Sequence, residues 1–256
     1  MDRKTVLRTF EDACVAHFGE AGGPQIAHLA RPGFEIEAAA DDASATGRCA
    51  LGGPALLEPG TPWPEADGHP LSLLAVLDVD AFAPWLGEHL PRRVGLLNFF
   101  IVQPAPGQPY PEVDFDDPAW LRVVPADPAQ VVQVPAPTGT VSFEREPLRA
   151  EPVLTMPDEW SPLVHAIDLG LDPPSSAAQV AEFYDACPLV RNPAGDAAFG
   201  WPVGELGAIH RWKDGHVHLL KLMDGQSGWP TLYFMIPEDA FRSGDFGQAL
   251  VTQETY

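Results

Sequence analysis

The sequence predicts an α+β protein that is rich in strands, with mainly antiparallel sheets and a few peripheral helices. Three observations predict this class. From Cys49 onward, short apolar runs are separated by Gly and Pro, which is typical of strands. Helical periodicity is confined to a few segments. In addition, 29 of the 256 residues are proline, which interrupts helices. The content of 45% hydrophobic and 20% charged residues is that of a globular protein, and we expect a single domain over residues 1–256.

The N-terminal segment, residues 1–40, begins with a predicted helix. Apolar side chains recur at three-to-four spacing from Val6 to Phe18, and Gly22-Gly23-Pro24 is expected to end the helix. A short strand is then expected over Arg31 to Glu37, followed by a loop over Ala38 to Gly47.

Two strands with a helix between them are predicted in the next part of the chain. The strands cover Leu71 to Leu77 and Val94 to Val102, and the helix covers Asp80 to Leu90 with Asp80 as its N-cap. This order of elements fits either a βαβ-like unit or a hairpin interrupted by a helix.

A proline-rich connection follows over about residues 104–162. It contains thirteen prolines, so no long helix is expected there. Edge or meander strands at Trp120 to Val124 and Val131 to Val134 remain compatible with this composition.

The last third of the chain is expected to mix one longer helix with paired strands. The elements are, in order, a helix with Ser175 or Ser176 as N-cap that ends before Pro188, strands over His216 to Met223 and Thr231 to Ile236, a short helix over Pro237 to Phe241, and an extended tail.

The two halves share an order of features that predicts an internal duplication, with a first repeat over about 48–125 and a second over about 195–256. The first half gives Trp63-Pro64, Asp67-Gly68-His69, Leu73-Leu74 before Asp78, and Leu97-Asn98-Phe99-Phe100-Ile101. The second gives Trp201-Pro202, Asp214-Gly215-His216, Leu219-Leu220 before Asp224, and Leu232-Tyr233-Phe234-Met235-Ile236. Two half-buried hairpins resemble each other even without common origin, because sheets bury Leu, Phe and Ile.

The charge argues against nucleic acid and anionic membranes as partners. The chain has 36 acidic and 15 basic residues, a net charge of −21. Residues 1–128 hold 19 acids and 8 bases and the remainder 17 and 7, so the halves carry −11 and −10. Binding to phosphates needs clustered Lys and Arg. A basic partner protein remains compatible with this field.

The sequence lacks the common catalytic signatures. It contains no phosphate-binding P-loop, no Gly-x-Gly-x-x-Gly, no Gly-x-Ser-x-Gly, no His-Glu-x-x-His and no Cys-x-x-Cys. No cofactor is expected. Its three cysteines are far apart, and no apolar run follows Met1 or approaches 18 residues, so we expect a soluble cytoplasmic protein.

His216-Val217-His218 is the best candidate for metal binding. Period-two spacing places both imidazoles on one face of a strand, and His210 and Asp224 are near in sequence. Two histidines on the exposed face of a hairpin are the more common outcome of this pattern.

A ligand pocket between the two halves is a second candidate site. The duplication would make Asp78 and Asp224 equivalent acids at strand ends, and Trp63 and Trp201 equivalent aromatic residues. These four residues are the predicted lining. Aromatic packing beneath proline-rich loops explains the tryptophans equally well.

The chain resembles the YwqG-like family of bacterial proteins from about Arg48 to its end. The resemblance is carried by Gly52-Gly53-Pro54, Trp63-Pro64, Pro70 to Asp78, Leu90-Pro91, Gly95 to Phe100, Ala119 to Val124, Pro147 to Pro152, Gly200-Trp201-Pro202 and Leu232 to Phe241. Val76 and Leu222 stand where the family usually has Gln. The resemblance implies a cytosolic α+β protein with two related halves, and an immunity-type or partner-binding role.

These observations predict a non-catalytic binding protein whose partner is a basic protein. The alternative is a small-ligand binder or enzyme with its pocket between the halves. A metal-dependent hydrolase that uses His216 and His218 is the third possibility.

Overall fold

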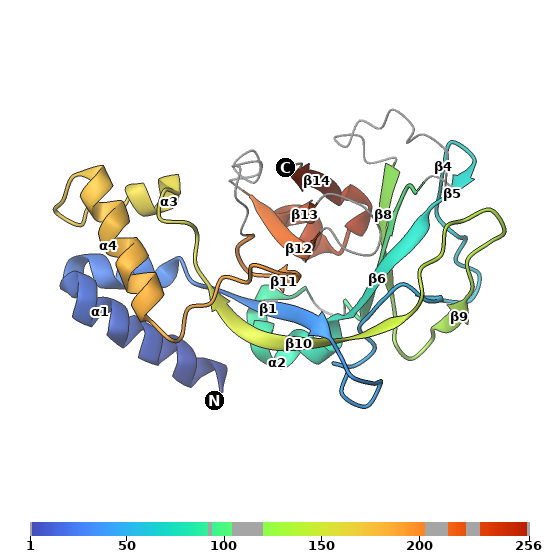
Figure 1. The fold of residues 1–256 in the computed structure, drawn as a ribbon, viewed down its shortest axis with the longest axis horizontal. Coiled ribbons are helices and arrows are strands. Elements are labelled where there is room, and N and C mark those ends of the chain that lie inside the picture. The colour runs from blue at the N-terminus through green and yellow to red at the C-terminus, as the bar shows by residue number, and fades with distance from the viewer. Residues whose placement is uncertain (1, 92–93, 104–119, 203–214, 224–230, 255–256) are drawn as a thin grey trace.

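The computed structural model describes residues 2–91, 94–103, 120–202, 215–223 and 231–254. Ten of the described strands form one curved sheet (Figure 1). In chain order they are β1 (Arg31–Ala38), β2 (Ala50–Leu51), β6 (Ser72–Asp78), β7 (Leu96–Ile101), β8 (Leu121–Ala126), β10 (Glu146–Thr155), β11 (Ala197–Phe199), β12 (His216–Leu222), β13 (Thr231–Pro237) and β14 (Leu250–Glu254).

The sheet order is β14-β13-β12-β11-β1-β10-β2-β6-β7-β8, and the neighbouring strands are antiparallel. At its centre, β1 and β10 pair over eight residues, from Arg31 opposite Thr155 to Ala38 opposite Leu148. The sheet curls until it nearly closes. The ring centroid of Phe99 on β7 lies 5.1 Å from that of Phe234 on β13, although six strands lie between β7 and β13 in the sheet order.

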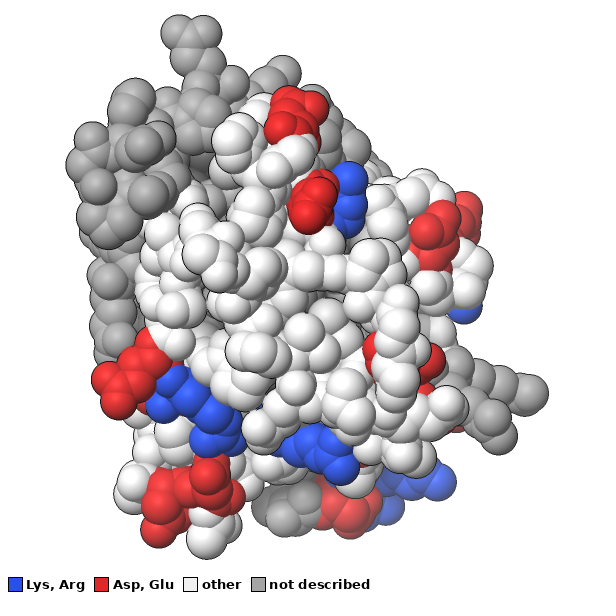
Figure 2. All heavy atoms as spheres, turned by 90° about the vertical axis from the view of Figure 1, so that its right-hand side faces the viewer, with Lys and Arg blue, Asp and Glu red and all other residues white. Residues whose placement is uncertain are grey.

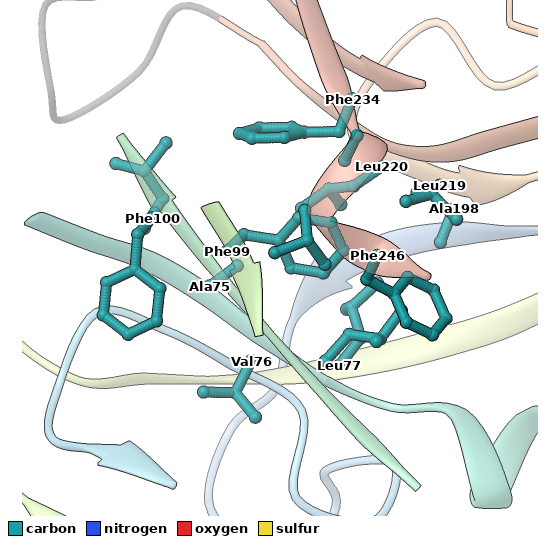
Figure 3. Close-up of a cluster of buried hydrophobic side chains, with 14 of the residues drawn as sticks. Ala75, Val76, Leu77, Phe99, Phe100, Ala198, Leu219, Leu220, Phe234 and Phe246 are labelled. Atoms are coloured by element: carbon teal, nitrogen blue, oxygen red, sulfur yellow. The ribbon is translucent and has the colours of Figure 1, made fainter. Parts of the chain in front are cut away.

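The main core fills the inside of this curl. Figure 3 shows side chains from β6, β7, β11, β12, β13 and the 3-10 helix η4 (Phe246–Gln248) gathered there, with Phe99 near the middle and Phe234 above it. Both rings are fully buried. Because β-strand side chains alternate between faces, Val76 points away from this cluster, to the opposite side of the sheet (Figure 3).

Two small two-stranded sheets lie outside the large sheet. One is the ladder of β3 (Ala55–Leu57) with β9 (Val132–Val134), and the other is the hairpin of β4 (Glu65–Ala66) with β5 (His69–Pro70). The β3 strand contacts β6, β7 and β8, so the β3–β9 ladder covers part of the outer side of the sheet.

The helices gather mainly at one end of the molecule. These are α1 (Arg3–His28), α3 (Pro162–His165) and α4 (Pro173–Ala186), drawn at the left of Figure 1, while α2 (Val79–Leu86), η1 (Gly87–His89) and α5 (Glu238–Ser243) lie along the sheet. The first group has a small core of its own, in which Phe10 and Phe183 contact Leu154 and Met156 at the end of β10. Among the described residues, no helix combines the length and the hydrophobicity that crossing a membrane requires.

The prediction of a mixed fold with a mostly antiparallel sheet is confirmed, and several details are corrected. The β6 and β7 strands are antiparallel, so they form a hairpin interrupted by α2 and not a βαβ unit. Asp78 caps α2 by accepting a hydrogen bond from the backbone N–H of Ala81, whereas Asp80 was the expected cap. Similarly, Asp172 and not Ser175 or Ser176 caps α4.

The first helix does not end at Gly22-Gly23-Pro24. The backbone breaks at Gly19, with φ of 75°, and a second helical stretch continues to His28. Pro24 is the fifth residue after this break, so it removes one hydrogen bond near the start of the second stretch and leaves the rest of that stretch helical. A Cβ on Gly23 would lie 2.5 Å from Val15 Cα, so the glycine allows the two stretches to pack closely.

Candidate functional site

A half-open groove of about 550 Å³ lies on the outer side of the sheet. The loop over residues 39–48 forms one wall of the groove, and the β3–β9 ladder forms the other wall. Its lining residues are Asp42, Gly47, Arg48, Ala50, Gly52, Pro54, Leu56, Val76, Val131, Gln133 and Arg145. A volume in this range accommodates a small organic molecule.

The floor of the groove is apolar. Ala50 of β2 pairs directly with Val76 of β6, and both residues are buried. Leu56 and Val131 extend this apolar surface along the β3–β9 wall and are partly exposed. A ligand in the groove would therefore cover apolar surface on two sides.

Asn98 fixes the β3–β9 wall of the groove to the sheet. Its side-chain amide makes hydrogen bonds to both backbone groups of Leu56, as a neighbouring strand would. The oxygen accepts the Leu56 N–H at 2.9 Å, and the nitrogen donates to the Leu56 carbonyl at 2.8 Å and to that of Val124 at 3.2 Å. Asn98 is fully buried, and burial of an amide is tolerated because these bonds satisfy it.

We expect Asn98→Ala to lower the free energy of unfolding by about 2 kcal/mol, because buried backbone groups of Leu56 and Val124 lose their partners. Hydrogen exchange of the Leu56 amide should accelerate more than that of amides in β12 and β13. If hydrogen exchange accelerated equally at Leu56 and in β12 and β13, the local role of Asn98 would be contradicted. Denaturant unfolding measures the stability, and mass-resolved exchange measures the location.

Arg48 is positioned by Gly47 and Asp78. The Asp78 carboxylate accepts the Arg48 N–H at 3.1 Å and also caps α2. Gly47 has φ of +57°, and a Cβ there would overlap this carboxylate. Further along the loop, Ser44 bonds the Asp41 carboxylate and lowers its pKa. Two hydrogen bonds anchor the loop to β10: the Thr46 N–H donates to the Leu148 carbonyl, and the Thr46 hydroxyl oxygen accepts the Ala150 N–H.

We expect Gly47→Ala to destabilise the protein by about 1–2 kcal/mol through backbone strain and loss of space for Asp78. The matched control is Gly60→Ala. Gly60 also has positive φ, of 86°, but has open space around it. The two variants share the backbone cost, so the difference between their unfolding free energies reports the Asp78 contact. Equal destabilisation would contradict that contact.

Arg145 reaches the groove across Gly52 and Gly53. Both glycines have positive φ, of 55° and 78°. A Cβ on Gly52 would lie 2.6 Å from the Glu144 carbonyl oxygen, and one on Gly53 would lie 2.8 Å from Arg145 Cβ. The glycine pair therefore admits the close approach of the chain that carries Arg145. A guanidinium nitrogen of Arg145 then pairs with Asp42 at 2.5 Å.

Figure 2 shows the side of the molecule that carries the β3–β9 ladder. Its centre is uncharged, and basic and acidic side chains lie next to each other along the lower part of this face. The even negative field expected from the composition is therefore interrupted here.

Three of the four residues of the predicted pocket are described, and these three lie in separate surroundings. Trp63 packs edge-on against Phe100, 5.1 Å between ring centroids, and its indole N–H donates to the Leu71 carbonyl. Trp201 donates to the Leu29 carbonyl and lies under the guanidinium of Arg31, 3.6 Å from the ring centroid.

Asp78 is occupied as a cap and loop anchor, as described above. Asp224 lies outside the described residues. Among the described residues, Trp63, Trp201 and Asp78 each contact different partners, and none of these contacts joins the three side chains to one another.

The two histidines of the predicted metal site differ in surroundings. His218 is fully buried, and its Nδ1 donates to the Phe199 carbonyl at 3.0 Å, so Nε2 carries the lone pair. Burial lowers the pKa of His218 to about 4. His216 is half-buried, and His210 lies outside the described residues. Within the described ranges, no group of three or more His, Cys, Asp or Glu side chains is placed to hold a metal ion.

The cysteines are buried thiols. Cys14, Cys49 and Cys187 are free, and burial raises the pKa values of Cys14 and Cys49 to about 12. A thiol with such a pKa is protonated at neutral pH and therefore a poor nucleophile.

Sequence reasoning missed Arg48 and Arg145 as site residues. The nearest signal was Gly52-Gly53-Pro54, whose glycines shape the groove. The two arginines are almost a hundred residues apart in the sequence, so their proximity in space is not visible there. The pairing between β2 and β10 brings their segments together.

A family model described as a domain of unknown function, DUF1963, matches residues 49–183. This match covers more than half of the chain and includes the floor of the groove, its β3–β9 wall and Arg145. Comparison with curated proteins gives no match.

Proposed function

The chain belongs to the DUF1963 family of domains of unknown function, and from this premise we propose that it is a non-catalytic binding protein whose ligand lies in the groove between the 39–48 loop and the β3–β9 ladder. The supporting observation is the construction of the groove. Hydrogen bonds fix both walls, glycines of positive φ position both arginines, and the floor is apolar.

Blocking the groove tests this proposal. Gln133 lines the groove on β9, and its neighbour Val132 points to the other face of the same strand and is 46% exposed. A ligand-observed NMR screen of small organic molecules against the full chain should find binders. These should lose binding to Gln133→Trp and keep binding to Val132→Trp.

The proposal would be contradicted if no molecule of the screen bound the wild type. It would be contradicted equally if all binders bound Gln133→Trp as tightly as the wild type. Thermal unfolding of both tryptophan variants checks that they fold alike.

Binding of a basic partner protein in an immunity-type role is our second candidate function. It is supported by the net charge of −21 and by a second cleft of about 440 Å³ near Glu58, Asp80 and Asp127. We place this activity in the cytoplasm, where buried free thiols remain reduced.

Affinity capture from the native organism at low and high salt, followed by mass spectrometry, tests this second candidate. The account expects a specific basic partner that is released by salt, because exposed charges are screened. Recovery of no specific partner counts against it.

We further infer that the chain is YwqG-like and arose by duplication. The strand order reads the same from either end when β1, β2, β6, β7 and β8 are matched with β10, β11, β12, β13 and β14. The β6–β7 and β12–β13 ladders each have a bulge, at Leu74 and Leu219. Two pairs of residues with positive φ stand at the ends of the matched strands β2 and β11: Gly52-Gly53 directly follows β2, and Phe199-Gly200 begins at the last residue of β11.

This matching changes the predicted equivalences. When the two bulges are aligned, the position equivalent to Asp78 is Met223 and not Asp224. Phe99 and Phe234 remain equivalent, as predicted. Superposition of β6–β7 on β12–β13 in an experimental structure tests the duplication. Failure of the two bulges to coincide would contradict it.

A further inference from the structure

We propose that the groove selects a small organic anion, namely a carboxylate, sulfonate or phosphate carried on an apolar body. This inference rests on the proposed function and specifies its ligand. It is carried by the placement of two guanidinium groups beside an apolar floor, in a chain with 15 basic and 36 acidic residues.

The two arginines supply donors for an anionic group. Arg48 is exposed, and its side chain makes no ion pair with any described residue. Arg145 shares one guanidinium nitrogen with Asp42, and its side chain is 38% exposed. Since a guanidinium has five N–H donors in a planar fork, the Asp42 pair leaves donors that match the oxygens of a carboxylate or phosphate.

The two carboxylates that contact the arginine residues, Asp42 and Asp78, are already engaged. Asp42 holds Arg145 from the rim, with 75% of its side chain exposed. The Asp78 carboxylate lies behind Gly47, where it accepts the backbone N–H groups of Arg48 and Ala81. Asp78 therefore holds the backbone of Arg48, and the Arg48 guanidinium remains available to a ligand.

The apolar floor determines what carries the anion. Ala50, Val76, Leu56, Pro54 and Val131 would contact a hydrocarbon or aromatic body. Burial of apolar surface contributes about 25 cal/mol per Å². An inorganic anion leaves this surface in water, so we expect an acid with an apolar portion to bind better than phosphate or sulfate alone.

Three probes of similar shape and different charge test the inference on the full chain: 1-naphthoate, 1-naphthalenemethanol and 1-naphthylmethylammonium. Isothermal titration calorimetry should give the tightest binding for the anion, with the neutral probe about tenfold weaker and the cation weaker still. Raising the salt concentration should reduce the advantage of the anion, because both arginines are accessible to solvent.

Arg48→Gln and Arg145→Gln should each reduce the preference for the anion over the neutral probe, by about fivefold. The control is Arg242→Gln, which removes an exposed arginine of α5 that pairs with Glu238. This control should retain the preference of the wild type. Circular dichroism verifies that each variant is folded.

Each outcome has a defined meaning. Equal affinity for the anion and the neutral probe, with both displaced by Gln133→Trp, would overturn the selection of anions and leave the binding groove intact. Anion preference that persists in both arginine variants would also overturn it. Absence of binding by all three probes, or binding that Gln133→Trp does not affect, would overturn the proposed function itself.

Discussion

Phe99→Ala should lower the free energy of unfolding by about 3–5 kcal/mol, the largest effect that we expect from a single substitution. Phe99 is fully buried, and its ring contacts that of Phe234 edge-on at 5.1 Å. The contact joins hairpins from opposite ends of the curved sheet, so the cavity left by alanine weakens the closure of the sheet. Chemical denaturation measures the effect.

A double-mutant cycle with Phe234→Ala separates the contact from the two cavities. The coupling between the rings should be about 0.5–1.5 kcal/mol. Val132→Ala, at an exposed position of β9, is the control and should change stability by less than about 0.5 kcal/mol. A loss at Phe99 no larger than that control would contradict the nearly closed core.

His218 should make the protein lose stability in acid. Burial lowers the pKa of His218 in the folded state to about 4, below the ordinary value of 6.5. The unfolded chain therefore binds the proton first as the pH falls. The contribution is complete above about pH 6.5 and is lost as the pH falls to about 4. A difference of this size corresponds to about 3 kcal/mol.

The groups near His218 act on its pKa in both directions, with burial as the dominant cause of its lowering. The Phe199 carbonyl, which accepts a hydrogen bond from Nδ1, raises the pKa, whereas the ammonium of Lys221 disfavours a charged imidazole and lowers it. The Tyr233 ring lies 6.4 Å away, and Nε2 has no hydrogen-bond partner among the described residues. The surroundings therefore accept the neutral ring more readily than the charged one.

His218→Gln tests this dependence, because glutamine is able to donate to the Phe199 carbonyl but does not titrate. Unfolding free energies of both proteins should be measured from pH 7 to pH 4. The wild type should lose up to about 3 kcal/mol more than the variant over this range. Parallel pH profiles would contradict a neutral, buried His218.

Much of the fold was accessible from the sequence. Regular alternation or continuous apolar runs located β1, β6, β7, β8, β9, β12 and β13 to within a few residues. The β10 strand was missed. It lies at the centre of the sheet, but Pro147 and Pro152 made its segment look like a connection. Both prolines sit in the strand that pairs with β1, where tertiary pairing overrides the local signal.

The helix caps show why local signals were misread. Asp78 and Asp80 are both suitable N-caps by residue type, and the distinction depends on where the preceding strand ends. Gly22-Gly23 resembled a helix stop, but it serves a contact between two helical stretches that propensity alone does not describe.

The candidate site was less accessible than the fold. Asp78 was selected for its place at a strand end, and it is the last residue of β6, where its carboxylate accepts hydrogen bonds from the backbone N–H groups of Arg48 and Ala81. Arg48, Gln133 and Arg145 meet only through pairings between distant strands. A single sequence does not reveal such pairings, because their spacing along the chain has no fixed period.

The measurement that tests the central claim most directly is a titration of the ¹⁵N-labelled full chain with 1-naphthoate, followed through backbone amide resonances. The account predicts that the largest shifts occur at Gly47, Arg48, Gly52 and Gln133, on both walls of the groove. Largest shifts at Gly95 and Asp127 in the acidic cleft, or in the helices at the far end of the molecule, would contradict it.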